Sequence, residues 1–279
     1  MNNEIAILMA TYNGCSYLEE QLDSIFRQTY ENWHLYVHDD GSTDSTVEIL
    51  KRYLTGNPEK MTILNYPSQH GTSENFMSML EHVEACYYMF CDQDDVWLEN
   101  KIELSIKSML SQEKDKNIPV VVHTDLIIVD EHLQEIYHSL WQYMDIRPSF
   151  VRSFHDCIIS YVTGCTMLIN KTMRDISIQI PRTHALMHDS WITACCHHKK
   201  GLVISLRTPS VLYRQHSNNV LGAIAASRIT LKYRMSNFCD MQKTNWHFLR
   251  MLNSIAPFPF WKFAINKFRY KIYLKSHEA

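Results

Sequence analysis

The sequence lacks any long hydrophobic run. No stretch reaches the ~20 apolar residues that a membrane-spanning helix requires. The amino terminus, MNNEIAILMATYNG, has no basic region and only a short apolar run before Thr11, so it does not resemble a signal peptide. We therefore expect a cytoplasmic protein whose eight cysteines remain reduced thiols. The cysteines show no regular spacing, and the adjacent residues of CCHH at 195–198 cannot converge on one zinc ion.

An overall positive charge is also missing. The formal net charge is −3, which gives no reason to expect a nucleic-acid partner. The charge is unevenly distributed, because residues 223–279 hold ten Lys and Arg and two acids, which leaves 17 basic and 28 acidic residues for 1–222. The pattern predicts an acidic body that carries a basic tail.

Repeats and low-complexity segments are absent, and short apolar runs alternate instead with helical patterns. Strands are predicted at 4–10, 33–40, 61–66 and 87–92. Helices are predicted at 16–28, where Ser16 and Glu19 suggest a capping box, and at 42–54, 73–86 and 99–112. Further strand patterns, with less regular helices between them, follow at 119–130 (with an interruption), 162–170, 201–206 and 210–216. This order predicts an α/β fold with a mainly parallel sheet and helices on both faces.

Polar residues follow three of these strands where each strand ends. In open parallel sheets, ligands bind beyond the carboxyl ends of the strands. The first, second and fourth strands end at Thr11 and Asn13, at Asp39 and Asp40, and at Asp92 and Asp94. The sequence therefore predicts that these side chains share one crevice.

The stretch FCDQDDVW, residues 90–97, places three carboxylates after an apolar run. They could form a solvated loop in which Asp95 caps the next helix, or an Asp-x-Asp metal site made by Asp92 and Asp94. Two like charges ~4 Å apart repel by about 4 kcal/mol at an effective dielectric of roughly 20, so carboxylates would reject a diphosphate without a divalent ion between them. We therefore favour a site for Mg²⁺ or Mn²⁺ with a phosphate-bearing ligand.

The stretch DDGSTDST, residues 39–46, has two interpretations. It has the composition of an Asp-Gly turn followed by Ser and Thr caps of a helix. It could also place Asp40 as a hydrogen-bond acceptor for a nucleobase or a ribose.

Four stretches together resemble the family-two glycosyltransferases of the GT-A fold. They are AILMATYNGCSYLEEQLDSIFRQTYENWHLYVHDDGSTDST, FCDQDDVW, MHDSWIT and YRQHSNNVLG, in that order. The resemblance is strongest to the rhamnosyltransferase-like enzymes of bacterial surface-polysaccharide synthesis, and it covers roughly residues 4–222. It implies a nucleoside-diphosphate sugar donor bound at the strand ends.

The resemblance also implies roles for individual residues at the strand ends. Thr11, Asn13 and Asp40 would contact the nucleoside, with Asp39 beside them. Asp92 would lie near the ribose and the metal ion.

The same resemblance assigns the metal site and the base. Asp94 would ligate Mg²⁺ or Mn²⁺, and His216 of YRQH would complete the metal site, although a histidine after a strand can also be purely structural. Asp189 of MHDSW would be the catalytic base, the N-cap of a helix, or both. A base there would take the proton of the acceptor hydroxyl in a single displacement that inverts the anomeric carbon. His188 would support that base or only pack beside it.

The resemblance assigns fewer residues to the diphosphate and to the acceptor than to the nucleoside and the metal ion. Many family members have a basic residue where this chain has Glu74, so few diphosphate contacts can be assigned. Arg214 is a candidate replacement, with a surface salt bridge as the alternative. Gly164 and Cys165 of TGC would line the acceptor site, with Gly164 allowing a close backbone approach.

The chain divides into a GT-A domain at 1–222 and a basic, aromatic tail at 223–279. The tail predicts two helices interrupted at Pro257 and Pro259, which would either pack on the body or attach to a membrane surface. Membrane attachment would suit the acceptor of such enzymes, which is often a glycan on a lipid diphosphate carrier.

The resemblance implies inverting, metal-dependent transfer of a sugar from a dTDP- or UDP-sugar, with rhamnose favoured, to a glycan of O-antigen or capsule synthesis. Two alternatives remain. One is a nucleotide-sugar-binding scaffold of the same fold without activity. The other is a sugar-nucleotide pyrophosphorylase, which is disfavoured because TYNGCSY has one Gly and no basic residue to hold a triphosphate.

Overall fold

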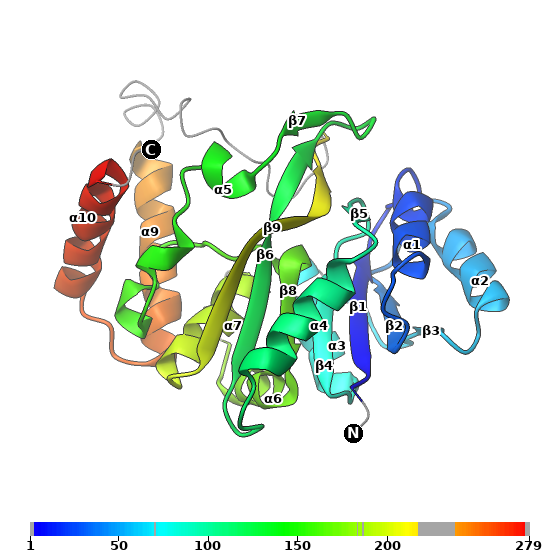
Figure 1. Ribbon diagram of the computed structural model, residues 1–279, viewed down its shortest axis with the longest axis horizontal. Coiled ribbons are helices and arrows are strands. Elements are labelled where there is room, and N and C mark those ends of the chain that lie inside the picture. The colour runs from blue at the N-terminus through cyan, green and yellow to red at the C-terminus, as the bar shows by residue number, and fades with distance from the viewer. Residues whose placement is uncertain (1–2, 70, 183, 186, 217–237, 277–279) are drawn as a thin grey trace.

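One sheet runs through the part of the chain that the computed structural model describes, which is residues 3–276 without 70, 183, 186 and 217–237 (Figure 1). Its strands follow the order β3-β2-β1-β4-β8-β6-β9-β5, and β7 pairs with β6. The strands are β1 (Ile5–Thr11), β2 (Trp33–Asp39), β3 (Met61–Ile63), β4 (Tyr87–Cys91), β5 (Val96–Trp97), β6 (Val120–Val129), β7 (Glu135–Tyr137), β8 (Met167–Asn170) and β9 (Leu202–Arg214).

The predicted parallel sheet is confirmed for the amino-terminal half. Strand β1 pairs in parallel with β2 and with β4, and β2 pairs in parallel with β3. Every residue of β1 (IAILMAT) and of β4 (YYMFC) is buried. A strand covered on both faces must be apolar throughout, which explains why these runs do not alternate with polar residues.

The carboxy-terminal half of the sheet is mixed, and the prediction was wrong in detail there. Strand β8 is antiparallel to both β4 and β6, while β9 is parallel to β6. The predicted strands at 201–206 and 210–216 are one strand, β9, and the interrupted pattern at 119–130 is the single strand β6. Pro209 pairs with Asp125, where the register shifts, and such an irregularity accommodates a proline within one strand.

Helices cover both faces of the sheet, as predicted. The helices are α1 (Leu18–Phe26), α2 (Thr46–Gly56), α3 (Thr72–His82), α4 (Lys101–Gln112), α5 (Leu140–Tyr143), α6 (Lys171–Gln179), α7 (His188–His198), α9 (Phe238–Ile255) and α10 (Phe260–Ser276), with short 3-10 turns at Pro148–Phe150, Phe154–Asp156 and Gly164–Thr166. The predicted capping box of Ser16 and Glu19 is not formed, because α1 has Tyr17 at its N-cap and no side-chain cap. The backbone N–H groups of Tyr17 and Leu18 donate instead to the Gly14 carbonyl.

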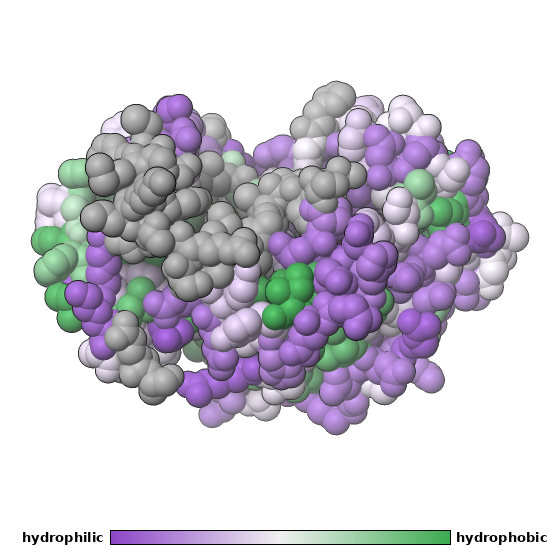
Figure 2. Space-filling model, turned by 90° about the horizontal axis from the view of Figure 1, so that it is seen from above, coloured by the Kyte–Doolittle hydropathy of each residue, from purple (hydrophilic) through white to green (hydrophobic). Residues whose placement is uncertain are grey.

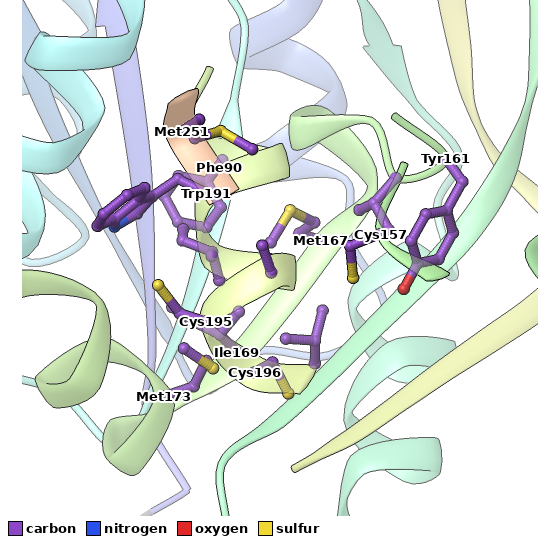
Figure 3. Packing of buried hydrophobic residues seen from close by; sticks show 14 of the residues in the cluster. Phe90, Cys157, Tyr161, Met167, Ile169, Met173, Trp191, Cys195, Cys196 and Met251 are labelled. Atoms are coloured by element: carbon purple, nitrogen blue, oxygen red, sulfur yellow. The ribbon is translucent and has the colours of Figure 1, made fainter. Parts of the chain in front are cut away.

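Two hydrophobic clusters lie on opposite faces of the sheet. Alternate residues of β1 enter each: Ile5, Ile7 and Met9 face α1, α2 and α4, whereas Ala6 and Leu8 face α3, α6, α7 and α9. Figure 3 shows the second cluster, in which residues of α7 pack beside sheet residues and beside Met251 of α9. The thiols of Cys195 and Cys196 are free and buried there.

The predicted helices of the tail are present as α9 and α10, separated at Ala256–Pro259. They pack on the body, because Leu252, Phe258, Phe263 and Tyr270 are buried in the cluster that contains α7. The predicted domain boundary at residue 222 lies outside the described residues. No helix within the described ranges combines the length and the apolar character needed to cross a bilayer.

Candidate active site

A cavity of about 700 Å³ opens at the carboxyl ends of β1 and β4. Its walls come from the loops after β1, β2 and β4, from the first turns of α3 and α7, and from residues 160–164. Six of the residues that the sequence predicted for the site line this cavity: Thr11, Asp40, Asp92, Asp94, Gly164 and Asp189. The other five do not line it: Asn13, Asp39, Cys165, Arg214 and His216.

Asp39 holds the turn after β2. Its carboxylate accepts hydrogen bonds from the Thr11 hydroxyl at 2.8 Å, from the Ser42 N–H at 2.8 Å and from the Gly41 N–H at 3.2 Å. Gly41 has φ of +92°, a conformation that glycine adopts without strain. In this structure, Asp39 therefore has the turn-forming role that DDGSTDST also suggested.

Asn13 joins the loops after β1 and β2. Its backbone has φ of +48°, its side-chain oxygen accepts from the Thr43 N–H at 2.8 Å, and its own N–H donates to the Ser42 hydroxyl at 2.8 Å. A nucleoside contact by Asn13 or Asp39 stays a prediction, because neither residue lines the cavity.

Asp40 does line the cavity. Its carboxylate accepts from the Ser68 hydroxyl at 2.6 Å, from the Gln69 N–H at 2.6 Å and from the Gly71 N–H at 3.0 Å. These bonds hold the chain that enters α3 against the end of β2. Asp40 thus shapes the wall of the cavity as well as contributing charge to it.

The acidic loop after β4 is held in place by the end of β9. The His216 Nε2 atom lies 2.9 Å from Asp94 Oδ2. Arg214 donates from Nε to the Asp94 carbonyl at 2.8 Å, and its backbone N–H donates to Asp95 Oδ1 at 3.1 Å. Asp94 and His216, which the resemblance assigned to the metal site, are therefore in contact although they are 122 positions apart, and their role as metal ligands stays a prediction.

Arg214 has protein partners for its guanidinium group. It forms an ion pair with Glu20, donates to the Glu131 carbonyl at 2.7 Å and lies 4.5 Å from the ring centre of Tyr17. Its side chain is 1% exposed. In this structure Arg214 positions the acidic loop, and the diphosphate contact assigned to it stays a prediction.

The carboxylates of Asp92, Asp94 and Asp95, in the loop after β4, lie close to one another. Burial and the neighbouring charges of Asp94 and Asp189 raise the pKa of Asp92 to about 7. Burial, with the charges of Asp94 and Asp92, raises the pKa of Asp95 well above its usual range. Like charges in a poorly solvated place are unfavourable, and either protonation or a bound cation relieves the repulsion.

The residues present fit a hard divalent ion. Oxygen atoms of Asp92 and Asp95 and the Cys165 sulfur lie within 4.8 Å of one another. Within the described residues, the buried Oδ2 atom of Asp95 has no hydrogen-bond partner. The Asp94 carboxylate, whose charge acts on Asp92 and Asp95, pairs with the His216 imidazole at 2.9 Å. Carboxylate oxygens are the ligands that Mn²⁺ and Mg²⁺ prefer. Cys165 does not line the cavity, so its acceptor role stays a prediction.

Asp189 lies in the first turn of α7, and the N-cap of that helix is Met187. The N-cap interpretation of Asp189 was therefore wrong. The Asp189 Oδ2 atom accepts from the Gly164 N–H at 3.2 Å, and Oδ1 accepts from the Ser190 N–H. Burial raises the pKa of Asp189 to about 6, although these two hydrogen bonds oppose the shift. A buried carboxylate with such a pKa is a competent general base.

His188 also lines the cavity, and its chemistry could not be read from the sequence. Its ring packs 4.5 Å from Phe76 and 4.9 Å from Phe90, between ring centres. Burial lowers its pKa to about 3, so the imidazole is neutral. Neither ring nitrogen has a hydrogen-bond partner among the described residues.

Gln93 is a site residue that the sequence analysis did not consider, although it lies between the two aspartates of Asp-x-Asp. Its side-chain amide forms two hydrogen bonds with the Tyr12 backbone, at 2.8 Å to the N–H and 3.0 Å to the carbonyl. It joins the loops after β1 and β4, and it leaves the Tyr12 ring 57% exposed at the cavity. Only the fold reveals this contact across 81 positions.

Comparison with known proteins agrees with this geometry. The family model described as Glycosyl transferase family 2 matches residues 6–176. The chain is 27% identical over 225 residues to the dTDP-rhamnosyl transferase RfbG of Shigella flexneri, covering 77% of this chain and 74% of that protein. It is 28% identical to the uncharacterized glycosyltransferase RP339 of Rickettsia prowazekii, where the match spans only 49% of that protein.

Solved structures share the fold. The structure of S. aureus TarS 1–349 in complex with UDP matches with a TM-score of 0.60 and 16% identity, covering 91% of this chain and 83% of that one. The Pyrobaculum calidifontis mannosyltransferase PcManGT, in complex with GDP-Man and Mn²⁺, matches with a TM-score of 0.56 and 14% identity, covering 99% of this chain and 76% of that one. At these identities the likeness concerns the fold alone, which is of the GT-A type.

Proposed function

The chain belongs to glycosyl transferase family 2, and from that premise we propose that it transfers a sugar from a nucleoside-diphosphate donor to a hydroxyl group of a glycan acceptor. The reaction is a single, inverting displacement that depends on Mn²⁺ or Mg²⁺. The product is a glycan of O-antigen or capsule synthesis. The observation that carries the proposal is one cavity lined by Asp92 and Asp94 from the loop after β4 and by Asp189 from the first turn of α7.

Asp92 and Asp94 suit the departure of the nucleoside diphosphate, and Asp189 suits the attack of the acceptor hydroxyl. Asp94 and His216, with Asp92 beside them, would hold the divalent ion, which when bound offsets the negative charge of the departing nucleoside diphosphate. The acceptor oxygen bonds to the anomeric carbon as the bond from that carbon to the phosphate oxygen breaks. Asp189 takes the hydroxyl proton on its carboxylate. The Gly164 N–H, 3.2 Å from Asp189 Oδ2, orients that carboxylate.

For the donor we favour dTDP-rhamnose, with UDP-sugars as the alternative. The relative from Shigella flexneri is named as a dTDP-rhamnosyl transferase, whereas the TarS structure contains UDP. Thr11 and Asp40 line the part of the cavity where a nucleoside would lie, and the exposed ring of Tyr12 offers a face for a nucleobase. Asn13 and Asp39 would support this nucleoside site from behind.

For the acceptor we propose a glycan on a lipid carrier, bound at residues 160–164 and in contact with Gly164. Cys165 would shape this part of the site from beneath. Such an acceptor places the enzyme in the cytoplasm, at the inner face of the plasma membrane. A relative from Escherichia coli, 30% identical over 106 residues, is named for a diphosphoundecaprenol-linked acceptor, which supports this class.

The direct test of the proposed function is donor turnover. Purified protein is incubated with dTDP-rhamnose and a panel of UDP-sugars, with Mn²⁺ or with a chelator, and released nucleoside diphosphate is measured. We expect release from one donor with Mn²⁺ and none with chelator. If no donor is turned over and no nucleotide binds in a metal-dependent manner, the inactive-scaffold alternative replaces the proposal.

The pKa of Asp189 leads to an expected pH dependence. With a pKa near 6, the carboxylate is protonated, and unable to accept a proton, below that pH. We expect kcat to fall as the pH is lowered through about 6, or somewhat below it, because a bound cation favours the carboxylate form. The nearby groups are Asp92 and His188, and His188 is neutral throughout since its pKa is about 3.

The measurement is kcat against pH with the metal ion saturating at every pH, so that protonation of metal ligands does not contribute. A second series with Asp189→Asn serves as the control, because its residual rate should lack the acid limb. A wild-type kcat that stays constant well below pH 6 would contradict the role of Asp189.

Gly164→Ala should impair catalysis through its neighbours. A Cβ atom at Gly164 would lie 2.3 Å from His188 Nε2 and 2.7 Å from Cε1, and His188 is confined by Phe76 and Phe90. Relief of this clash moves the Gly164 N–H away from Asp189. We expect kcat to fall by about 10-fold to 100-fold, with a loss of about 1–3 kcal/mol in the free energy of unfolding.

The matched control is Gly56→Ala, because no atom lies within 4 Å of a Cβ placed there. It should leave kcat unchanged. Adding His188→Ala to Gly164→Ala removes the clash and should recover stability. If Gly164→Ala retains the full kcat and stability, the close contact with His188 has no consequence and the assigned positioning role is wrong.

A further inference from the structure

Helix α10 carries apolar residues on two opposite faces. Its inner face packs on the body through Phe263 and Tyr270, which are 4% and 9% exposed. A surface helix with one buried apolar face normally has a polar face toward solvent. On α10 the outward residues are instead large and apolar, with exposures of 67% for Phe260, 59% for Trp261, 51% for Ile265, 65% for Phe268 and 52% for Ile272.

These five residues, which we name the outer stripe of α10, form one continuous surface. Trp261, Ile265, Phe268 and Ile272 follow one another at intervals of four, three and four residues, and Phe260 directly precedes Trp261, so all five lie on one side of a helix with 3.6 residues per turn. The 12 steps from Phe260 to Ile272, at 1.5 Å each, make the stripe roughly 18 Å long. Figure 2 shows hydrophobic residues gathered at the edge of the molecule where Figure 1 places α10, at the end opposite to α1 and α2.

Positive charge accompanies the outer stripe. Helix α10 contains Lys262, Lys267, Arg269, Lys271 and Lys275 and no acidic residue. Lys271 and Lys275 are exposed on the same side as the stripe, and Lys262 Nζ lies 5.5 Å from the ring centre of Trp261. Apolar side chains flanked by Lys and Arg, with a tryptophan among them, are the features of helices that lie in the headgroup region of anionic membranes.

We propose that the outer stripe of α10 and its cations form a docking surface for an anionic lipid bilayer. The stripe enters the interface while the exposed Lys271 and Lys275, with Lys262 beside Trp261, contact lipid phosphates. Arg269 instead pairs with Asp156 of the body, and Lys267 lies over the inner Phe263 ring. A second copy of this chain is a poorer occupant, because stripe-to-stripe contact would bring Lys271 and Lys275 of both copies together without any acid on either helix. A nucleic acid would meet the cations but would leave the apolar stripe exposed to water.

The inner face of α10 connects this surface to the cavity. The Tyr270 hydroxyl accepts from the Arg147 N–H at 3.1 Å and donates to the Asp145 carbonyl at 3.1 Å. Ile146, between those two residues, lines the cavity. Docking of α10 would therefore hold the cavity close to the bilayer surface, where an acceptor on a lipid carrier is available. The use of a lipid-linked acceptor rests on the proposed function, whereas the binding of α10 to the bilayer does not.

The test is binding of the full chain to vesicles of phosphatidylglycerol and phosphatidylcholine, measured by co-sedimentation. We expect wild-type protein to bind, to bind vesicles of phosphatidylcholine alone only weakly, and to lose affinity as salt rises. Trp261→Ser with Phe268→Ser should weaken binding by about tenfold or more, since interfacial affinity follows the buried apolar area. The matched control is Ile136→Ser with Leu202→Ser, which removes residues 49% and 40% exposed on β7 and β9 and should bind as wild type.

Three results would overturn the proposal. The first is that wild-type protein does not bind anionic vesicles. The second is that both double variants bind them equally well. The third is that the wild type binds no vesicles but forms a dimer, and that Trp261→Ser with Phe268→Ser dissociates this dimer. Donor turnover without vesicles should be unchanged in this variant, because the stripe lies outside the cavity. Vesicle binding by Asp189→Asn protein should equal that of wild type, so failure of the docking surface and failure of the proposed activity are distinguishable.

Discussion

Asp189→Asn is expected to lower kcat for sugar transfer by about 1,000-fold, within the range that a general base contributes. The amide keeps the size of the side chain and can still accept from the Gly164 N–H, so the wall of the cavity should persist. It cannot take up the proton of the acceptor hydroxyl. Donor affinity in the presence of Mn²⁺ should stay within about twofold of wild type, because the change removes an interaction made only in the transition state.

The measurements are nucleoside diphosphate release in the presence of acceptor and calorimetric binding of the donor. Glu48→Gln is the matched control, since it converts an exposed carboxylate on α2 to an amide and should change neither quantity. If Asp189→Asn transfers at the wild-type rate, another group must act as the base.

Asp94→Asn is expected to abolish the strengthening of nucleotide binding by Mn²⁺. The variant retains the shape of the side chain, and it removes one negative charge from the cluster that contains Asp92 and Asp95. Loss of an outer partner of a metal ligand already costs about 10-fold to 100-fold in metal affinity, so loss of a ligand should cost at least as much. Donor turnover should disappear with it.

The same variant gives an opposite result without metal. In chelator, wild-type carboxylates repel the diphosphate, whereas Asp94→Asn carries one charge fewer, so it should bind the free nucleotide at least as tightly as wild type does. Calorimetry with dTDP and UDP, with Mn²⁺ or with chelator, measures both effects. An undiminished Mn²⁺ effect in Asp94→Asn would place the ion elsewhere.

The amino-terminal half of the fold was predictable because local sequence determines it. Strands β1 and β4 are buried on both faces, so their residues form continuous apolar runs. The long strands β6 and β9 were not predictable, because a shift in register between them allows Pro209 and its polar neighbours to remain in one strand. A register shift is a property of two strands together, and neither strand shows it alone.

The candidate site was predictable to the same degree. The carboxyl ends of parallel strands collect in one place, which brings Thr11, Asp40, Asp92 and Asp94 to one cavity. The contacts of Arg214 were not predictable, because its partners Glu20 and Asp94 lie 194 and 120 positions away. From the sequence, Arg214 could be interpreted as a ligand of the diphosphate, because it is a cation near the acidic residues. Only the fold shows that its guanidinium group is buried among hydrogen-bond acceptors of the protein.

The exposed face of α10 also could not be predicted from the sequence. Its composition suggested either packing on the body or membrane attachment, and these were treated as alternatives. The structure shows that one helix has room for both, since Phe263 and Tyr270 face the body while Trp261 and Phe268 face outward. Composition gives the number of apolar residues, whereas only the packed helix shows which of them remain exposed.

The central claim is that a divalent ion joins Asp94 to the phosphates of a bound nucleotide. The most direct measurement is anomalous diffraction from crystals grown with Mn²⁺ and dTDP or UDP. The account predicts a manganese peak within ligand distance, roughly 2.0–2.3 Å, of an Asp94 carboxylate oxygen and of a diphosphate oxygen, with His216 beside it. A nucleotide bound in the cavity with no manganese between it and Asp94 would contradict the account.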